Sequence, residues 1–332
     1  MDAVALYVAT LVVYFFIFNI MTWGLNIQFG YAGILDFTYI TFFAAGAYFA
    51  GVGALGRPGV DSNMRYIFGL HWPFLAALLL GAIVAGVLGL LVGLVALNRL
   101  RSDYLAIVTV SVGAIAYDFV GNFTSLFNGW DGIAGVPYPF NDQLKLDPNS
   151  YIFFYILLSG IIMAILWVVA NRLTASPLGR SMRAIREDAD VAEAFGKDTY
   201  RIRMIAMVIG CVYAGIGGAL LIGFISAINP SGWTAGETFV IWAALLVGGR
   251  GNNLGAVLGA LLVPVVFQEA TRYLPEISGR PELIPAIRNI IVGSLLIGVL
   301  WFRPQGILPE RKRRFASLRP RPLAKEEPHA AG

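Results

Sequence analysis

Residues 3–35 read AVALYVATLVVYFFIFNIMTWGLNIQFGYAGIL, and no charged residue lies between Asp2 and Asp36. A helix that crosses a lipid bilayer needs about 20 consecutive, largely apolar residues. This stretch is long enough for one such helix over residues 3–21, ahead of a polar, glycine-containing break at residues 26–33. The N-terminal segment therefore predicts a membrane-spanning helix rather than part of a soluble core.

The composition of the whole chain agrees with a membrane protein. Of the 332 residues, 58% are hydrophobic and 13% are charged, and the mean hydropathy is +0.72. Soluble domains have about 45–50% apolar and about 25% charged residues. The difference argues against a soluble enzyme, a disordered chain and a nucleic-acid-binding protein.

The residue types that carry most enzyme chemistry are scarce. One cysteine and two histidines leave no disulfide framework and no cysteine-based metal site. None of the four lysines stands in the Gly-Lys-Ser/Thr pattern of a phosphate-binding loop. We therefore expect no cofactor, metal or ATPase site on this chain, and we expect that it is not itself an enzyme.

The apolar runs predict an all-α polytopic membrane protein with about nine transmembrane helices. The predicted spans are residues 3–21, 37–55, 74–97, 104–122, 151–170, 204–228, 237–249, 254–270 and 284–302. The seventh is short for a crossing, so it would either cross with help from other segments or form a broken or re-entrant half-helix. Residues 1–302 would then form the transmembrane domain, and residues 303–332 a basic, disordered cytoplasmic tail.

Lysine and arginine predict the orientation of the chain, because they concentrate in cytoplasmic connections. With nine crossings, 18 of the 24 basic residues fall on one side, most of them in residues 172–203 and after residue 302. That side is predicted to be cytoplasmic. The N-terminus would then lie outside the cell and the C-terminus in the cytoplasm.

The longest cytoplasmic connection, residues 173–203, contains a predicted amphipathic helix. Ser176 is a good N-cap, Pro177 suits the first helical position and Gly196 suits the residue after the last turn. Between them, apolar residues recur at spacings of three and four and predict one continuous helix with one apolar face. The residues of that face are Leu178, Met182, Ile185, Ala189, Ala192 and Phe195.

Such a helix outside the bilayer has to bury its apolar face. One interpretation is a helix in the lipid interface, held by its arginines. The other is a docking helix in the groove of a partner protein. The acidic residues of the segment, among them Glu187 and Asp190, favour the docking helix because anionic lipid would repel them.

Several blocks of the chain, in order, resemble permeases of the LivM type, which are membrane subunits of ABC importers for branched-chain amino acids. The resemblance covers nearly everything from residue 20 to residue 310. The blocks are residues 26–48, RSDYLAIVT at 101–109, GRSMRAIRE at 179–187 with AEAFG at 192–196, VGGRGN at 247–252 with GAVLGA at 255–260, and FRPQGIL at 302–308.

The resemblance implies a complete importer in the inner membrane of a prokaryote. Its partners would be a second, LivH-like permease subunit, two cytoplasmic ABC ATPases that bind ATP and Mg, an extracytoplasmic solute-binding protein and membrane lipid, with no nucleic acid. Urea, amides or other amino acids remain alternative solutes. An ion-driven secondary transporter is the alternative from a different class.

The resemblance also implies that the segment around residues 177–196 contacts the ATPase. The implied coupling residues are Gly179, Arg180, Arg183, Ala184, Ile185, Arg186, Glu187, Asp190, Ala192, Glu193, Phe195 and Gly196. Asp190 stands six residues before Gly196, which is the spacing of an acid and a glycine in the general importer motif. Aspartate stands here where glutamate is usual.

Polar residues at membrane depth are candidates for a translocation path. These are Asn26, Gln28, Gly30 and Asp36 in and after the polar break, and Asp118 in the fourth predicted helix. Irregular backbone at membrane depth has to line a cavity or pack within protein. The alternatives are that the break is a connection between two spans and that Asp118 faces water. An amino acid zwitterion needs few dedicated charges, because helix ends can satisfy its charged groups.

Overall fold

The computed structural model describes residues 3–58, 64–97, 102–272 and 283–310, and they are mostly helical. The first half contains α1 Ala3–Leu25, the π-helical turn η1 Asn26–Tyr31, α2 Tyr39–Ala54, α3 Phe74–Ala96, α4 Ser102–Asn122, α5 Thr124–Phe127, η2 Gly129–Asp131, β1 Ile133–Ala134, α6 Asn141–Leu144 and α7 Pro148–Ala175. The second half contains α8 Pro177–Glu187, α9 Ala189–Ala194, α10 Thr199–Ile225, β2 Ala227–Ile228, η3 Pro230–Gly232, α11 Ala235–Gly248, α12 Asn253–Leu261, η4 Leu262–Phe267, α13 Gln268–Arg272 and α14 Leu283–Phe302.

Six helical segments among the described residues are long and apolar enough to cross a membrane. They are Val4–Tyr31, Phe74–Ala96, Tyr104–Asn122, Asn149–Ala175, Thr199–Ile225 and Asn253–Thr271. Two shorter apolar helices, Tyr39–Ala54 and Ala286–Phe302, and the 14-residue helix α11 occupy the other three predicted segments. By length and composition alone, six of the nine predicted spans are supported within the described residues, and the count of nine stays a prediction.

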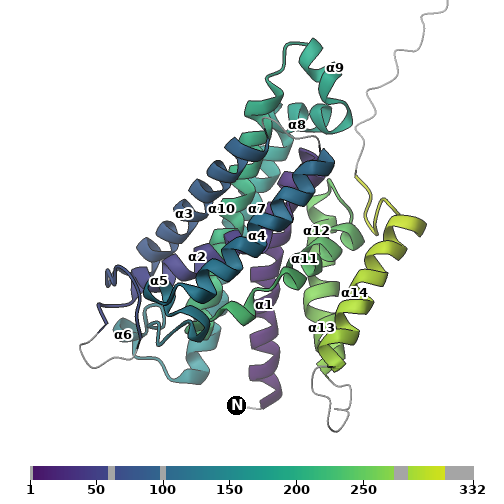
Figure 1. The fold of residues 1–332 in the computed structure, drawn as a ribbon. Helices are drawn as coiled ribbons and strands as arrows, with labels where there is room; N and C mark the ends of the chain where they lie inside the picture. The colour runs from purple at the N-terminus through teal and green to yellow at the C-terminus, as the bar shows by residue number, and fades with distance from the viewer. Residues whose placement is uncertain (1–2, 59–63, 98–101, 273–282, 311–332) are drawn as a thin grey trace, which may run out of the picture.

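The long helices run side by side between two ends of a bundle (Figure 1). Helices α8 and α9 project at one end, and the N-terminus and the short elements α5 and α6 lie at the other (Figure 1). A two-stranded antiparallel pair joins β1 to β2, with Ile133 opposite Ile228. This pair fastens the connection after α4 to the end of α10.

Helix α10 forms the centre of the bundle and packs against α1, α2 and α3. Glycines allow the backbones to approach closely, because a side chain at these positions would have no space. A Cβ atom built on Gly46 of α2 would overlap the backbone of Gly215 on α10, and one on Gly218 would overlap the carbonyl of Phe43. Small residues at helix contacts are the usual way in which membrane helices associate.

A leucine at Gly46 should therefore prevent the bundle from forming. We expect Gly46→Leu to lower the free energy of unfolding by about 3 kcal/mol or more, because backbone atoms of α10 cannot move aside as a side chain would. Size-exclusion chromatography and thermal unfolding of the protein in detergent would measure the loss. Gly293→Leu on α14 is the matched control, since nothing lies within 4 Å of a Cβ built there. Equal stability of the two variants would contradict the packing argument.

Residues 303–310, which follow α14, are hydrogen-bonded to the bundle. Within residues 303–310, the first residues of the predicted tail, Ile307 N–H donates to the carbonyl of Val247 (2.8 Å) and Leu308 N–H to that of Gly248 (2.9 Å). The remaining tail, residues 311–332, lies outside the described part of the chain. Residues 303–310 therefore belong to the folded bundle rather than to a disordered tail.

Candidate functional site

The segment after α7 forms two short helices, so the prediction of one continuous helix over residues 177–196 is wrong. Asp188 between them has extended backbone (φ −156°, ψ 111°), and its carboxylate accepts a hydrogen bond from Val191 N–H (3.0 Å). Aspartate is a preferred N-cap, and this side chain competes with the continuing helix for a backbone donor. The sequence signal was therefore present at Asp188, inside the otherwise regular apolar pattern.

The ends of this helical pair are as predicted. The Ser176 hydroxyl accepts a hydrogen bond from Gly179 N–H at the start of α8 (3.4 Å), and Pro177 follows it. Gly196 has a left-handed backbone (φ +76°), and Lys197 N–H closes the last turn on the carbonyl of Ala192 (3.1 Å). A residue without Cβ adopts this conformation at no steric cost.

Most of the predicted apolar face is covered by the bundle of this chain itself. Met182, Ile185 and Ala192 are at most 5% exposed. Gly179 packs against the carbonyls of Leu173 and Thr174 with no room for a side chain. Because the kink at Asp188 turns α9 relative to α8, Phe195 leaves this face and is 81% exposed. The buried face therefore holds the helices on the bundle and is not available to a partner.

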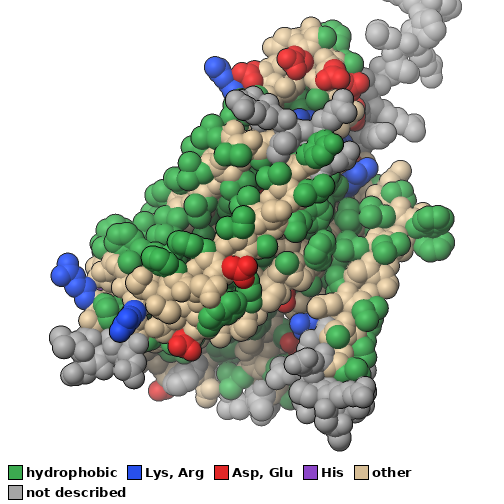
Figure 2. Space-filling model, viewed as in Figure 1, with side chains coloured by type: hydrophobic (Ala, Val, Ile, Leu, Met, Phe, Trp, Pro, Cys, Tyr) green, Lys and Arg blue, Asp and Glu red, His purple; other side chains and the backbone are tan. Residues whose placement is uncertain are grey.

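A second face of the two helices is open. We call it the coupling ridge, and it consists of the exposed residues Arg180, Ala184, Glu187, Asp190, Val191, Glu193, Phe195 and Gly196. Acidic side chains gather at this end of the molecule (Figure 2). The ridge combines charges of both signs with an exposed aromatic ring and projects away from the long helices (Figure 1). A projecting polar surface around an aromatic anchor is suited to contact with another protein.

Two arginines of α8 point inward instead. Arg186 forms an ion pair with Glu310 (2.6 Å) and donates a hydrogen bond to the carbonyl of Gly30, with both charged side chains about four-fifths buried. Arg183 donates to the carbonyl of Thr174 (3.2 Å) and lies over the ring of Tyr31 (5.6 Å to the centroid). These side chains tie α8 to α7, to η1 and to the segment after α14.

The polar break after α1 is mostly helical and buried. The π-helical turn η1 continues α1, and Asn26 and Gln28 are fully buried. Asn26 donates to the side chain of Asn253 (3.0 Å) and accepts from Gly251 N–H (2.8 Å), whereas Gln28 donates to the carbonyl of Met207 (3.0 Å). A Cβ at Gly30 would meet Asn26 and Gly251. These three candidates therefore join α1 to α10 and α12.

Asp36 lies in the linker between η1 and α2 and is also fully buried. One carboxylate oxygen accepts from Thr38 N–H (2.9 Å), and the other has no hydrogen-bond partner among the described residues. The carbonyl of Asp36 accepts from the Trp242 indole (3.1 Å), and Phe37 N–H donates to the hydroxyl of Thr109 (3.1 Å). The linker is thus clamped between α4 and α11.

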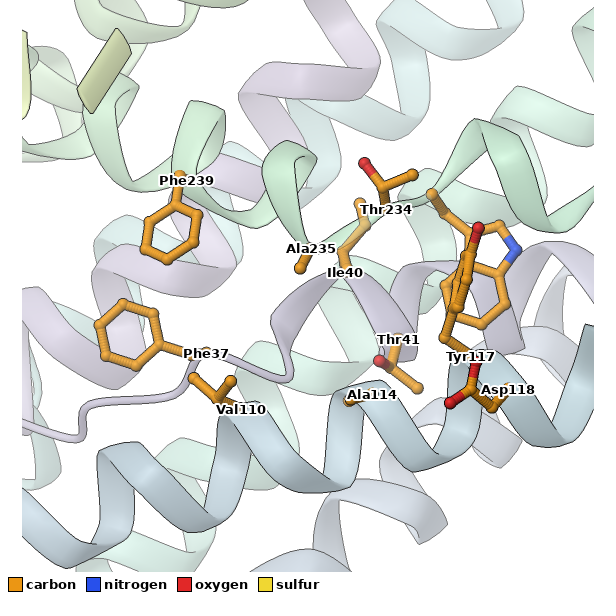
Figure 3. A pocket seen from close by; sticks show the side chains of 12 residues that line it. Phe37, Ile40, Thr41, Val110, Ala114, Tyr117, Asp118, Thr234, Ala235 and Phe239 are labelled. Atoms are coloured by element: carbon orange, nitrogen blue, oxygen red, sulfur yellow. The ribbon is translucent and has the colours of Figure 1, made fainter. Parts of the chain in front are cut away.

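A cavity of about 280 Å³ lies next to this linker, between α2, α4 and the start of α11 (Figure 3). It is lined by Phe37, Ile40, Thr41, Val110, Gly113, Ala114, Tyr117, Asp118, Trp233, Thr234, Ala235 and Phe239. Of the predicted path residues, Asp118 borders this cavity and its side chain is exposed. The helical spacing of Val110, Gly113, Ala114 and Tyr117 marks one face of α4, but only the fold places Phe37 and Phe239 opposite it.

Residues 7–300 match the family described as "Branched-chain amino acid transport system / permease component". The chain is 30% identical to the high-affinity branched-chain amino acid transport system permease protein LivM of Escherichia coli (strain K12), over 88% of this chain and 68% of that protein. It is 27% identical to a probable LivM permease of Methanocaldococcus jannaschii, over 92% of this chain and 94% of that protein. It is 28% identical to LivH of Salmonella typhimurium, over 86% of this chain and 89% of that protein. A comparison with solved structures finds no significant match.

The match extends over almost the whole bundle and covers the six long apolar helices, the first of them from residue 7 onward. These helices and the family together make the chain a multi-pass membrane protein. Members of this family are permease subunits of ABC transporters, in which separate subunits hydrolyse ATP, so the chain is not itself an enzyme. The chain belongs to the permease-component family of branched-chain amino acid transport systems.

Proposed function

We propose that this chain is one of two permease subunits in an importer that moves leucine-like amino acids into a prokaryotic cell. Two cytoplasmic ATPases that bind ATP and Mg would drive it, and an extracytoplasmic binding protein would deliver the solute. Its relatives include both LivM and LivH proteins, which supports pairing with a second, similar permease. The observation that carries the proposal is the coupling ridge on α8 and α9, which projects from one end of the bundle (Figure 1).

The proposed docking of the ATPase uses only the outward-facing residues of the coupling segment. Arg180, Glu187, Asp190, Glu193 and Phe195 would contact the ATPase, because they are exposed. The inward-facing members, Gly179, Arg183, Ile185, Arg186 and Ala192, would carry movement of the ridge into the bundle. Rigid contacts of this kind are what a mechanical link between two subunits requires.

In the proposed topology the chain crosses the membrane nine times, with the N-terminus outside and the C-terminus in the cytoplasm. The basic residues of the α7–α10 connection support this orientation. Helix α11, with 14 residues, is only about 21 Å long at 1.5 Å per residue, against about 30 Å of hydrocarbon. It would complete its crossing with the help of residues 230–234 and 249–252, of which Pro230, Trp233, Gly249 and Gly251 are buried within the protein.

Partner ATPases with an inactivated phosphate-binding lysine provide the test. In proteoliposomes that contain the complete transporter, we expect this change to reduce leucine uptake to background, because this chain has no ATP site of its own. Uptake would be measured with radiolabelled leucine and leucine-loaded binding protein. Urea and other amino acids as competitors would separate the alternative solutes.

The ion-driven alternative makes the opposite prediction. A secondary transporter would take up leucine from this chain alone when an ion gradient is applied. Uptake by the purified chain without ATPases, or unchanged uptake with inactivated ATPases, would overturn the proposed function.

A further inference from the structure

The cavity between α2, α4 and α11 has two chemically different ends (Figure 3). Phe37, Val110 and Phe239 lie toward one end, and Thr41, Tyr117 and Asp118 lie toward the other (Figure 3). Its volume of about 280 Å³ is at the lower limit of the usual range for small-molecule sites, about 300–1,000 Å³. The size and the division into two ends fit a small amphipathic molecule.

The apolar end is held in shape by its surroundings. The rings of Phe37 and Phe239 lie 5.7 Å apart between centroids, and Phe37 also stacks on Trp242 at 4.9 Å. The hydrogen bond from Phe37 N–H to Thr109 fixes the backbone of the linker beneath them. A preformed apolar wall of this kind binds an aliphatic side chain without first having to be ordered.

The polar end contains a negatively charged carboxylate and, opposite in character, groups that attract a negative charge. No described residue donates a hydrogen bond to the exposed carboxylate of Asp118, which leaves this oxygen pair open to an ammonium group. The hydroxyl of Thr41 is buried and has no partner among the described residues. Thr234 and Ala235 place the N-terminus of α11 at the cavity, where no side chain caps the helix. A helix N-terminus attracts a carboxylate.

We infer that this cavity is a station for the transported amino acid inside the permease. Asp118 would bind the α-ammonium group. The N-terminus of α11 and the Thr41 hydroxyl would bind the α-carboxylate, and the branched side chain would lie against Phe37, Val110 and Phe239. The inference rests on the proposed function, because only an importer passes its solute through the bundle. A lipid chain in the same place would leave the polar groups of this cavity without partners.

Filling the cavity from α4 tests the assignment. A Cβ built on Gly113 lies 3.6 Å from the Thr41 hydroxyl, at ordinary contact distance, so the backbone tolerates a side chain there. Gly113→Leu should place that side chain in the cavity and lower leucine uptake by about tenfold or more. Gly293→Leu on α14, where a Cβ meets nothing within 4 Å, is the matched control and should leave uptake unchanged.

The charge at the polar end provides a second test. Asp118→Asn keeps the shape of the side chain and removes its charge, and it should lower leucine uptake by about tenfold. Asp118→Glu should restore most of the uptake. Both Asp118 variants and Gly113→Leu should still assemble with the second permease and the ATPases. Leucine-loaded binding protein should still stimulate their ATP hydrolysis, because the coupling ridge is untouched.

The outcomes separate the inference from the proposed function. If the wild-type complex takes up no leucine, both are overturned. If the wild type transports leucine and Gly113→Leu and Asp118→Asn transport it equally well, the station is overturned and the importer is not. If Gly113→Leu no longer co-purifies with the second permease, the cavity is a contact between permeases, and the station is again overturned.

Discussion

The Phe195→Asp variant should fold and insert normally but fail to recruit the ATPase subunits. Phe195 is 81% exposed, so the bundle loses almost no packing when the ring is replaced. An aromatic anchor at the centre of an interface contributes about 2 kcal/mol or more of binding free energy. A carboxylate placed in the pocket of the partner that would receive the ring adds a desolvation cost. We therefore expect the ATPase to bind at least about 30-fold more weakly.

Co-purification of the ATPases with the tagged permease, and ATP hydrolysis stimulated by loaded binding protein, would measure this loss. Phe195→Leu is the conservative control and should retain most of the binding, since it keeps an apolar side chain. Ala192→Asp is the contrasting variant, because Ala192 is only 5% exposed and a charge there should destabilise the chain itself. Normal ATPase stoichiometry with Phe195→Asp would show that the coupling ridge is not the docking surface.

The second large effect should come from Arg186, which joins α8 to the bundle. Its guanidinium holds Glu310 through one nitrogen (2.6 Å) and the carbonyl of Gly30 through another. A Cβ on Gly251 would come within 3.0 Å of the same guanidinium, which shows how tightly this corner is packed. Arg186→Gln should leave docking of the ATPase intact and lower the leucine transported per ATP hydrolysed by about tenfold. The physical reason is that α8 could then move without moving η1.

Variants of Arg186 and of its ion-pair partner Glu310 distinguish a mechanical role of this contact from a loss of stability. Glu310→Gln removes the ion pair but leaves the bond from Arg186 to Gly30, so it should uncouple less than Arg186→Gln does. Arg186→Lys should rescue only partly, because a single ammonium group does not reproduce the forked geometry of the guanidinium. Thermal unfolding of each variant serves as the stability control. A wild-type ratio of transport to hydrolysis in Arg186→Gln would contradict the link.

Prediction from sequence was most accurate where a long apolar run is compatible with only one structure, a helix. The predicted span 74–97 is the helix Phe74–Ala96, and 104–122 lies within Ser102–Asn122. It was least accurate where a side chain competes with the backbone, as at Asp188. The π-helical turn η1 was also missed. Its side chains Gln28 and Asn26 donate hydrogen bonds to α10 and α12, which are remote in sequence.

The candidate site likewise combines residues that stand out in the sequence with residues that only the fold brings together. Asp118 was identified because a charge inside an apolar helix stands out in the sequence. Phe37 and Phe239 look like ordinary core aromatics, and 202 positions separate them along the chain. Likewise, Arg180 and Arg186 are equally plausible partners for an ATPase by sequence, whereas the fold exposes the first and pairs the second with Glu310.

Hydropathy and charge along the chain were thus sufficient to predict a helical membrane protein, because the requirement of about 20 apolar residues per crossing is met locally. The family resemblance came separately, from the ordered blocks of sequence. The ends of the segment, at Pro177 and Gly196, were also set locally, each by the conformational preference of a single residue. Only the tertiary structure decided which face of that segment remains open and which residues meet at the cavity. Both depend on how helices distant in sequence pack, and packing is set by the shapes of all partners together.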